Sequence, residues 1–232
     1  MTTTKRATAG AFVLAATLGL GATSVVPAQS AVMAAPTGTT TTVAVQSPTV
    51  VYGDTTKLTV SVDAASNGAK PAGKVEVEVG DKTLVADVTN SGKVDFDWPL
   101  VDASRTPYAV TASFVPTDAT AFSTSASVPV NVTVVKSPTA TTLAARHNKL
   151  KRKIVATSAT TSAHGQVPTG KVKFVLKRNG RRTAATVVPL TSTAAAKAVF
   201  RKVSSKGRYK VVAKYLGSVN FLRSKTSFDI TS

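Results

Sequence analysis

The sequence predicts an all-β protein with two tandem Greek-key β-sandwiches that follow an N-terminal signal peptide. Three observations lead to this expectation. Apolar and polar residues alternate in several segments, motifs recur about one hundred residues apart, and turn-forming Asn-Gly or Ser-Gly pairs separate the alternating segments. Alternation in β-branched and aromatic residues is typical of strands with one face in a core. Several short strands per hundred residues, with regular turn signals, favour a Greek-key sandwich.

The first 34 residues contain the three parts of a secretory signal peptide. Lys5 and Arg6 form a short basic start, residues 9–26 are apolar, and small residues then allow cleavage after Ser30 or Ala34. An uncleaved membrane anchor is the alternative, because the apolar run is nearly long enough to span a bilayer. The glycine and threonine content of the run and the small residues after it favour cleavage, and hence a secreted protein.

The remainder of the chain consists of two copies of one unit, residues 35–136 and residues 137–232. A Pro-x-Gly-Lys-Val-x-Val/Phe motif begins at Pro71 and again at Pro168. A Tyr-x-Val-x-Ala-x-Phe/Tyr motif begins at Tyr108 and again at Tyr209. A repeat of this length indicates duplicated domains rather than a solenoid of small units.

Within each copy, the alternating segments are expected to form strands. They are residues 57–62, 74–79 and 108–114 in the first copy, and residues 171–176 and 209–215 in the second. Turns are expected at Asn67-Gly68, Ser91-Gly92 and Asn179-Gly180, because these pairs favour tight turns between strands.

The two shared motifs together resemble the bacterial immunoglobulin-like repeat domains of secreted and surface proteins. In the second copy, the segment Tyr-Leu-Gly-Ser-Val-Asn-Phe at residues 215–221 is similar to that family's Tyr-x-Gly-Asp-x-Asn-Phe segment, with Ser218 where aspartate is usual. The first copy departs further in the equivalent loop, residues 115–120. The resemblance covers residues 38–232 and implies immunoglobulin-like sandwiches that serve as spacers, adhesion modules or appendages of enzymes. It implies no particular ligand.

Charge is divided unequally between the two copies. The whole chain carries a formal net charge of +18. Residues 35–135 contain six Lys or Arg and ten Asp or Glu, a balance of −4, whereas residues 136–232 contain 21 Lys or Arg and the single acid Asp229, a balance of +20. Such asymmetry bears on binding partners, since it does not specify a fold and adds self-repulsion.

Two groups of cations in the second copy are the candidate polyanion-binding residues. The first precedes an expected strand and the second surrounds the Asn179-Gly180 turn, where the two flanks of a hairpin lie about 5 Å apart. The seven residues are Lys151, Arg152, Lys153, Lys177, Arg178, Arg181 and Arg182. A solvated cationic surface that only keeps the protein soluble is the alternative interpretation.

Catalytic chemistry is poorly represented, and no catalytic residue, cofactor or metal site is expected. The chain contains no cysteine. His147 and His164 are interpreted as exposed residues of turns, since metal ligation needs several ligands at set spacing. Asp95 and Asp97 share the outer face of a strand and could form a Ca²⁺ site or a glycosidase pair, but a solvated strand face is favoured. Trp98 is expected in the core rather than as a platform for a sugar.

These observations lead to two hypotheses about function. In the first, the chain is a secreted, non-enzymatic structural or adhesion-type module, extracellular and associated non-covalently with the cell wall through its basic second copy. In the second, it is a dedicated polyanion-binding protein whose ligand is an anionic wall polymer, an acidic polysaccharide or extracellular DNA. Neither hypothesis includes a small-molecule substrate or sequence-specific nucleic-acid recognition, and the membrane is a partner only through the signal peptide before cleavage.

Overall fold

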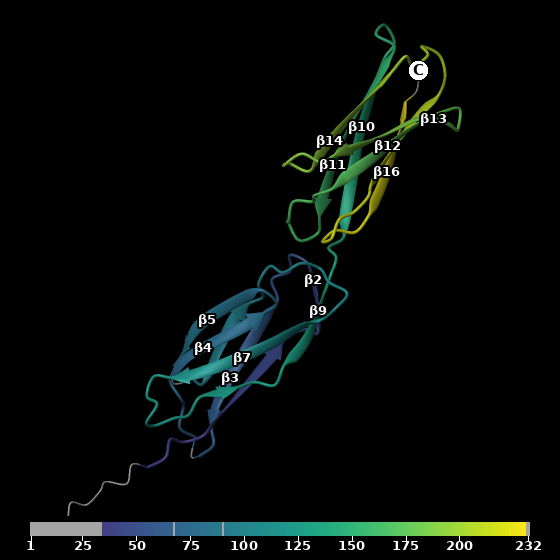
Figure 1. Ribbon diagram of the computed structural model, residues 1–232. Helices are drawn as coiled ribbons and strands as arrows, with labels where there is room; N and C mark the ends of the chain where they lie inside the picture. Colours follow the sequence, from purple (N-terminus) through teal and green to yellow (C-terminus); the bar gives the residue numbers. More distant parts are fainter. Residues whose placement is uncertain (1–33, 67, 90, 231–232) are drawn as a thin grey trace, which may run out of the picture. The chain divides into compact units, whose positions relative to one another are not determined.

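The computed structural model describes residues 34–66, 68–89 and 91–230 (Figure 1). In these ranges the chain forms strands, turns and bends without a helix, and hence no helix that could cross a membrane. The predicted fold class is confirmed, because the strands build two immunoglobulin-like β-sandwiches in tandem, each with its own apolar core. The expected signal peptide lies outside the described residues. The domain boundary between residues 136 and 137 stays a proposal.

The first sandwich is formed by the strands that precede residue 136. One sheet has the order β1-β3-β6 and the other has the order β2-β9-β7-β4-β5, with β8 paired to β7. Strand β2 runs parallel to β9, while the neighbours of β7 are antiparallel to it. The strands are β1 (Thr39–Val45), β2 (Thr49–Val51), β3 (Lys57–Ala64), β4 (Gly73–Val79), β5 (Lys82–Val88), β6 (Lys93–Asp97), β7 (Tyr108–Pro116), β8 (Ser125–Ala126) and β9 (Val130–Val135).

The second sandwich repeats this arrangement with fewer, longer strands. Its sheets have the orders β10-β11-β14 and β13-β12-β15-β16, and neighbouring strands in both sheets run antiparallel. The strands are β10 (Thr139–Asn148), β11 (Lys153–Ser162), β12 (Lys171–Arg178), β13 (Arg181–Pro189), β14 (Ala195–Arg201), β15 (Tyr209–Tyr215) and β16 (Ser224–Ile230).

All five strands that the alternation predicts are present. In β4, Val75 and Val77 are buried while Lys74 and Glu76 between them are exposed. Turns also form at Ser91-Gly92 and Asn179-Gly180 as predicted, whereas Asn67 lies outside the described residues. Burial of one face of each strand against the facing sheet explains the period-two pattern.

Each sandwich contains a tyrosine whose hydroxyl bonds to the chain just before its own strand. Tyr108 opens β7 and donates to the carbonyl of Asp102 at 2.8 Å, and Tyr209 opens β15 and donates to the carbonyl of Ser204 at 3.1 Å. This arrangement is the tyrosine corner of immunoglobulin-like sandwiches. Burial, with the nearby Asp102 carboxylate, raises the pKa of Tyr108 above its ordinary value of 10.0, so this hydroxyl retains its donor proton throughout the neutral pH range.

Replacing Tyr209 by phenylalanine should destabilise the second sandwich by about 1 kcal/mol, since the ring is kept and one partly buried hydrogen bond is lost. Urea unfolding followed by far-UV circular dichroism measures the change. Tyr108→Phe should cost less, because its hydroxyl bond is exposed to water. Unchanged stability of Tyr209→Phe would contradict a structural role for the corner.

The segment at residues 215–221 closes one end of the second sandwich. Tyr215 is buried and donates its hydroxyl to the carbonyl of Thr169 at 2.5 Å, while the Ser218 amide donates to the carbonyl of Phe221 at 3.1 Å. The buried Asn220 side chain donates to the Asp102 carboxylate at 2.7 Å and accepts the Ala103 amide at 2.8 Å. Tyr215 and Asn220 of this motif therefore have structural roles through their side chains, whereas Ser218 contributes its backbone amide.

Candidate polyanion-binding surface

The predicted cationic hairpin forms between β12 and β13. Asn179 and Gly180 at its turn have φ of 48° and 80°, the left-handed pair that a tight two-residue hairpin requires. Lys177 lies opposite Arg182, and Arg178 lies opposite Arg181. The structure therefore brings these four sequence-predicted cations together at one end of the sheet.

The hairpin cations point to two different sides of the sheet. Leu176 is buried in the core, so Lys177 beside it points outward and Arg178 points back to the core side. There Arg178 Nη2 donates to the carbonyl of Lys206 at 3.0 Å and lies 3.4 Å from Ser204 Oγ. Arg178 thus anchors the loop between β14 and β15, a structural role that its place in a basic run does not indicate.

The other predicted group lies at the turn between β10 and β11. Lys151 and Arg152 are exposed in this turn, and Arg152 has a positive φ of 46°. Lys153 begins β11, where it lies directly opposite Arg201 of β14. Like charges in such a pair are unfavourable. An anionic ligand would relieve this repulsion.

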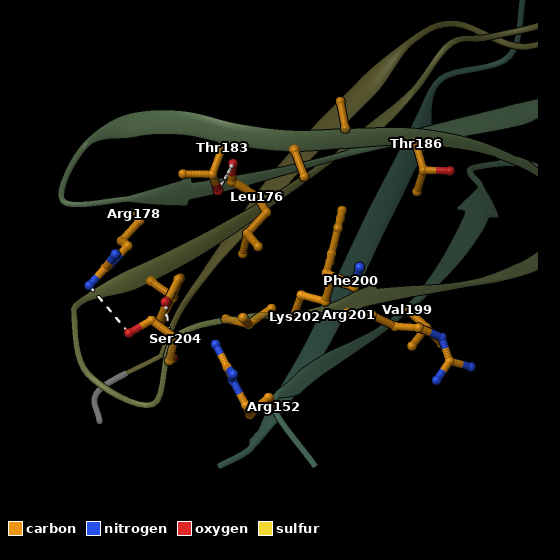
Figure 2. A pocket seen from close by; sticks show the side chains of 14 residues that line it. Arg152, Leu176, Arg178, Thr183, Thr186, Val199, Phe200, Arg201, Lys202 and Ser204 are labelled. Atoms are coloured by element: carbon orange, nitrogen blue, oxygen red, sulfur yellow. Dashed lines mark hydrogen bonds between the residues drawn. The ribbon is translucent and has the colours of Figure 1, made fainter. Parts of the chain in front are cut away.

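A cavity of about 470 Å³ is lined by one cation from each predicted group, Arg152 and Arg178. Figure 2 shows Thr183 and Thr186 of β13 on one side, Phe200 and Lys202 on the other, and Arg178 hydrogen-bonded to Ser204 at one end. Its lining holds four cations and no acid, namely Arg152, Arg178, Arg201 and Lys202. The cavity can therefore accept a small anionic group.

Sequence reasoning missed Arg201 and Lys202 as neighbours of the predicted cations. They lie about fifty residues after Arg152 in the chain and reach it only because β14 pairs with β11. The alternation of β14 could have placed Arg201 on the outer face of its strand. The alternation could not have identified Lys153 as the residue that lies opposite Arg201.

The remaining polar candidates are involved in structural contacts. Asp95 accepts a hydrogen bond from the Thr59 hydroxyl at 2.6 Å, and Asp97 forms an ion pair with Lys57 at 2.5 Å. The hydrogen bond to Asp97 raises the pKa of the Lys57 ammonium. The interpretation of this pair as a solvated strand face is confirmed, and within the described ranges no group of three His, Cys, Asp or Glu side chains could hold a metal ion.

The prediction of exposed turn histidines is correct only in part. His164 lies in a turn as expected but is half-buried, and His147 belongs to β10 and is also half-buried. Its ring packs edge-on against Tyr209 with ring centroids 5.4 Å apart. The single tryptophan, Trp98, is 8% exposed and belongs to the first core, which confirms that prediction.

No protein-family model matches the chain, and no curated protein matches it. Among solved structures, it is similar to a tetra-tandem repeat in the extending region of a large adhesion protein, with 14% identity, a TM-score of 0.49, and 83% of this chain and 48% of that chain covered. It is also similar to the adhesin InvE of Yersinia pseudotuberculosis, with 12% identity, a TM-score of 0.42 and coverages of 83% and 59%. The chain thus spans roughly half of the first structure and under two thirds of the second.

Proposed function

We propose that the chain is a secreted, non-enzymatic structural or adhesion-type module that is held at the cell envelope by its basic second sandwich. The unequal charge of two sandwiches with one fold carries this proposal. The first half has a balance of −4 and the second a balance of +20. Because the first sandwich forms the same fold without excess positive charge, the fold does not require the cations. An anionic partner gives them a function.

The proposed partner is an anionic polymer of the cell envelope, which the chain binds non-covalently outside the cell. Within the second sandwich as described, Lys210–Asp229 at 3.2 Å is the one ion pair between a basic and an acidic side chain. The other cations have no acid to neutralise them, so each can attract a phosphate or carboxylate of a polymer. The predicted site comprises Lys151, Arg152, Lys153, Lys177, Arg178, Arg181 and Arg182.

The alternative function, a dedicated binder of one polyanion, is favoured by the cation-lined cavity between β13 and β14. A concave site can select the shape of an anionic group, whereas a flat surface selects only charge density. Retention on one ligand at high salt would indicate this function. Equal, salt-sensitive binding to all polyanions would indicate attachment by charge alone.

Binding of the chain to purified anionic wall polymer, heparin and DNA over a salt series tests the proposal. We expect binding at low salt, with the logarithm of the affinity falling linearly as the logarithm of the salt concentration rises. Absence of binding to every polyanion at low salt would refute attachment by the second sandwich.

A hairpin variant with Lys177, Arg181 and Arg182 changed to Ser should bind wall polymer about tenfold more weakly than the parent. Arg178 is kept because it anchors a loop. The matched control changes three exposed cations outside the hairpin and the loop that it anchors, Arg146, Lys149 and Lys197, to Ser. Equal losses in the two variants would show that the hairpin is no site.

A further inference from the structure

The outer face of the sheet β13-β12-β15-β16 carries lysines from three neighbouring strands in one row. Lys173 of β12 lies opposite Lys214 of β15, and Lys214 lies opposite Lys225 of β16. Directly opposite residues point to the same side of a sheet with Cβ atoms about 5 Å apart. These three lysines are therefore aligned across the strands, although they are far apart in the sequence.

A second basic row lies four residues along the strands, about 13 Å from the first. Here Lys177 of β12 lies opposite both Arg182 of β13 and Lys210 of β15. Lys210 in turn pairs with Asp229, the single acid of the second half. The predicted hairpin thus forms one end of a larger cationic face.

Two valines lie on this outer face between the basic rows. Val175 and Val212 lie opposite each other and are 8% and 5% exposed, yet neither belongs to the apolar core beneath the sheet. Lys173, Lys177 and Lys210, on either side of the two valines, are themselves only half-exposed. We therefore attribute the low exposure of the valines to the aliphatic stems of these lysines. Long basic side chains commonly cover apolar surface in this way while the ammonium groups stay in water.

The first sandwich has no cation at the positions that correspond to the lysine row. There Glu76 of β4 lies opposite Ser113 of β7, and Ser113 lies opposite Ala126 of β8. The two rows occupy the same register of the same fold, as the shared motifs that precede them show. The lysines are therefore a property of the second sandwich and not a requirement of the sheet.

Repulsion among the three lysines of the row lowers the stability of the sheet unless an anion neutralises them. Like charges directly opposite each other in a sheet are destabilising, and no acid of the described chain pairs with Lys173, Lys214 or Lys225. A polymer with regularly spaced negative charges would neutralise the row. A single small anion could meet only one or two of its members.

Single-stranded nucleic acid is the less suitable polymer, because single strands bind by stacking bases on exposed aromatic rings. In the described part of the second sandwich, Phe174, Phe200, Tyr209, Tyr215 and Phe221 are buried. The remaining aromatic ring of this kind, Phe228, lies opposite the core residue Val211 and so on the other side of the sheet. The outer face of β12, β15 and β16 presents lysine ammonium groups and no aromatic ring.

We infer that the outer face of β12, β15 and β16 is the main contact surface for a flexible linear polyanion without bases, and that the row Lys173–Lys214–Lys225 is its centre. This inference rests on the polyanion binding proposed above and names the surface and the kind of polymer. The shared chemistry is a series of phosphate or carboxylate groups along a flexible, non-aromatic chain. The cations beside the hairpin turn and the cavity contribute at one end.

The test compares two variants of the whole chain that have the same net charge. The row variant changes Lys173, Lys214 and Lys225 to Gln, and the control variant changes Arg146, Lys149 and Lys197 to Gln. Inorganic polyphosphate and polyuronate serve as probes, with an oligothymidylate of equal charge as the nucleic-acid comparison. Affinities are measured over a salt series, and thermal unfolding is recorded for both variants.

We expect the row variant to bind polyphosphate or polyuronate about 10- to 100-fold more weakly at 0.1 M salt. The slope of log affinity against log salt should fall in magnitude by about 2, the amount expected for three lost contacts. The control variant should keep the slope of the parent. The row variant should unfold at a temperature no lower than that of the parent, because the loss of its like-charge pairs offsets the shorter apolar stem at position 173. A stable variant that binds poorly excludes misfolding as the cause.

Each other outcome overturns a distinct statement. If the parent binds and both variants lose the same affinity and slope, the inference about the row is wrong while the proposed function stands. If the parent prefers oligothymidylate to both other probes at equal charge, the class of polymer is wrong. If the parent binds none of the probes at low salt, the proposed function fails together with the inference.

Discussion

Replacing Phe174 by alanine should destabilise the second sandwich by about 3–5 kcal/mol and leave the unfolding of the first sandwich unchanged. Phe174 is fully buried in the second core, so its loss would leave a cavity there. Trp98, the single tryptophan, belongs to the first core, so its fluorescence follows the unfolding of that sandwich. Urea unfolding read by far-UV circular dichroism and by tryptophan fluorescence separates the two effects.

The matched control is Phe228→Ala, which removes the same side chain from a position that is 38% exposed. It should cost far less than Phe174→Ala, because little buried apolar surface is lost. If Phe174→Ala shifts the fluorescence transition as far as the dichroism transition, the two cores unfold as one unit. The proposed boundary between residues 136 and 137 would then not separate independently stable domains.

Replacing Gly73 by alanine should destabilise the first sandwich by about 3 kcal/mol, through overpacking. A Cβ at this position would overlap the carbonyl oxygen of Val115 and lie 2.6 Å from the ring of Phe114. Val115 and Phe114 belong to β7, the central strand that pairs with β4. Because backbone atoms form part of the clash, the strand itself would have to move. The fluorescence of Trp98 in urea measures this loss.

Gly38→Ala is the control for Gly73→Ala. Its Cβ would meet the Ala65 side chain at 3.7 Å, an ordinary contact, so we expect no loss and a small gain from the stiffer unfolded chain. An unchanged fluorescence midpoint for Gly73→Ala would mean that β4 and β7 can separate locally without cost. The close packing of the two strands would then not be what requires glycine at position 73.

The same motif position requires glycine for a different reason in the second sandwich. Gly170 has a φ of 117°, which side chains rarely adopt, and its Cβ would lie 3.0 Å from the carbonyl oxygen of Gly217. The sequence shows that Pro-x-Gly recurs at Pro71 and Pro168. It does not show that Gly73 is needed because two strands pack closely there. Nor does it show that Gly170 is needed for its positive φ in addition to a close contact.

Local alternation was sufficient to predict the strands, since burial of every second residue depends only on the neighbours in the chain. It therefore placed β3, β4, β7, β12 and β15 correctly. Alternation was insufficient to predict the strand that contains His147, and the sequence instead led to the interpretation of a turn there. The packing of its ring on Tyr209 comes from a residue about sixty positions away.

The candidate site was predicted only as far as its cations are neighbours in the sequence. The hairpin formed because Asn179-Gly180 favours its turn, and Lys177 faces Arg182 as a consequence. The separation of Lys177 and Arg178 onto opposite sides of the sheet followed from alternation. The hydrogen bonds that Arg178 makes to the β14–β15 loop could not be predicted from alternation.

By itself, the sequence determined the two-sandwich fold, the duplication and the concentration of positive charge in the second half, because each depends on local pattern or on composition. Only the tertiary structure decided which cations are neighbours. Lys173, Lys214 and Lys225 form one row because of the register of β12, β15 and β16. Register is fixed by pairing between distant segments and by the packing of both sheets on one core, and a shift of one residue would move the whole row to the other face.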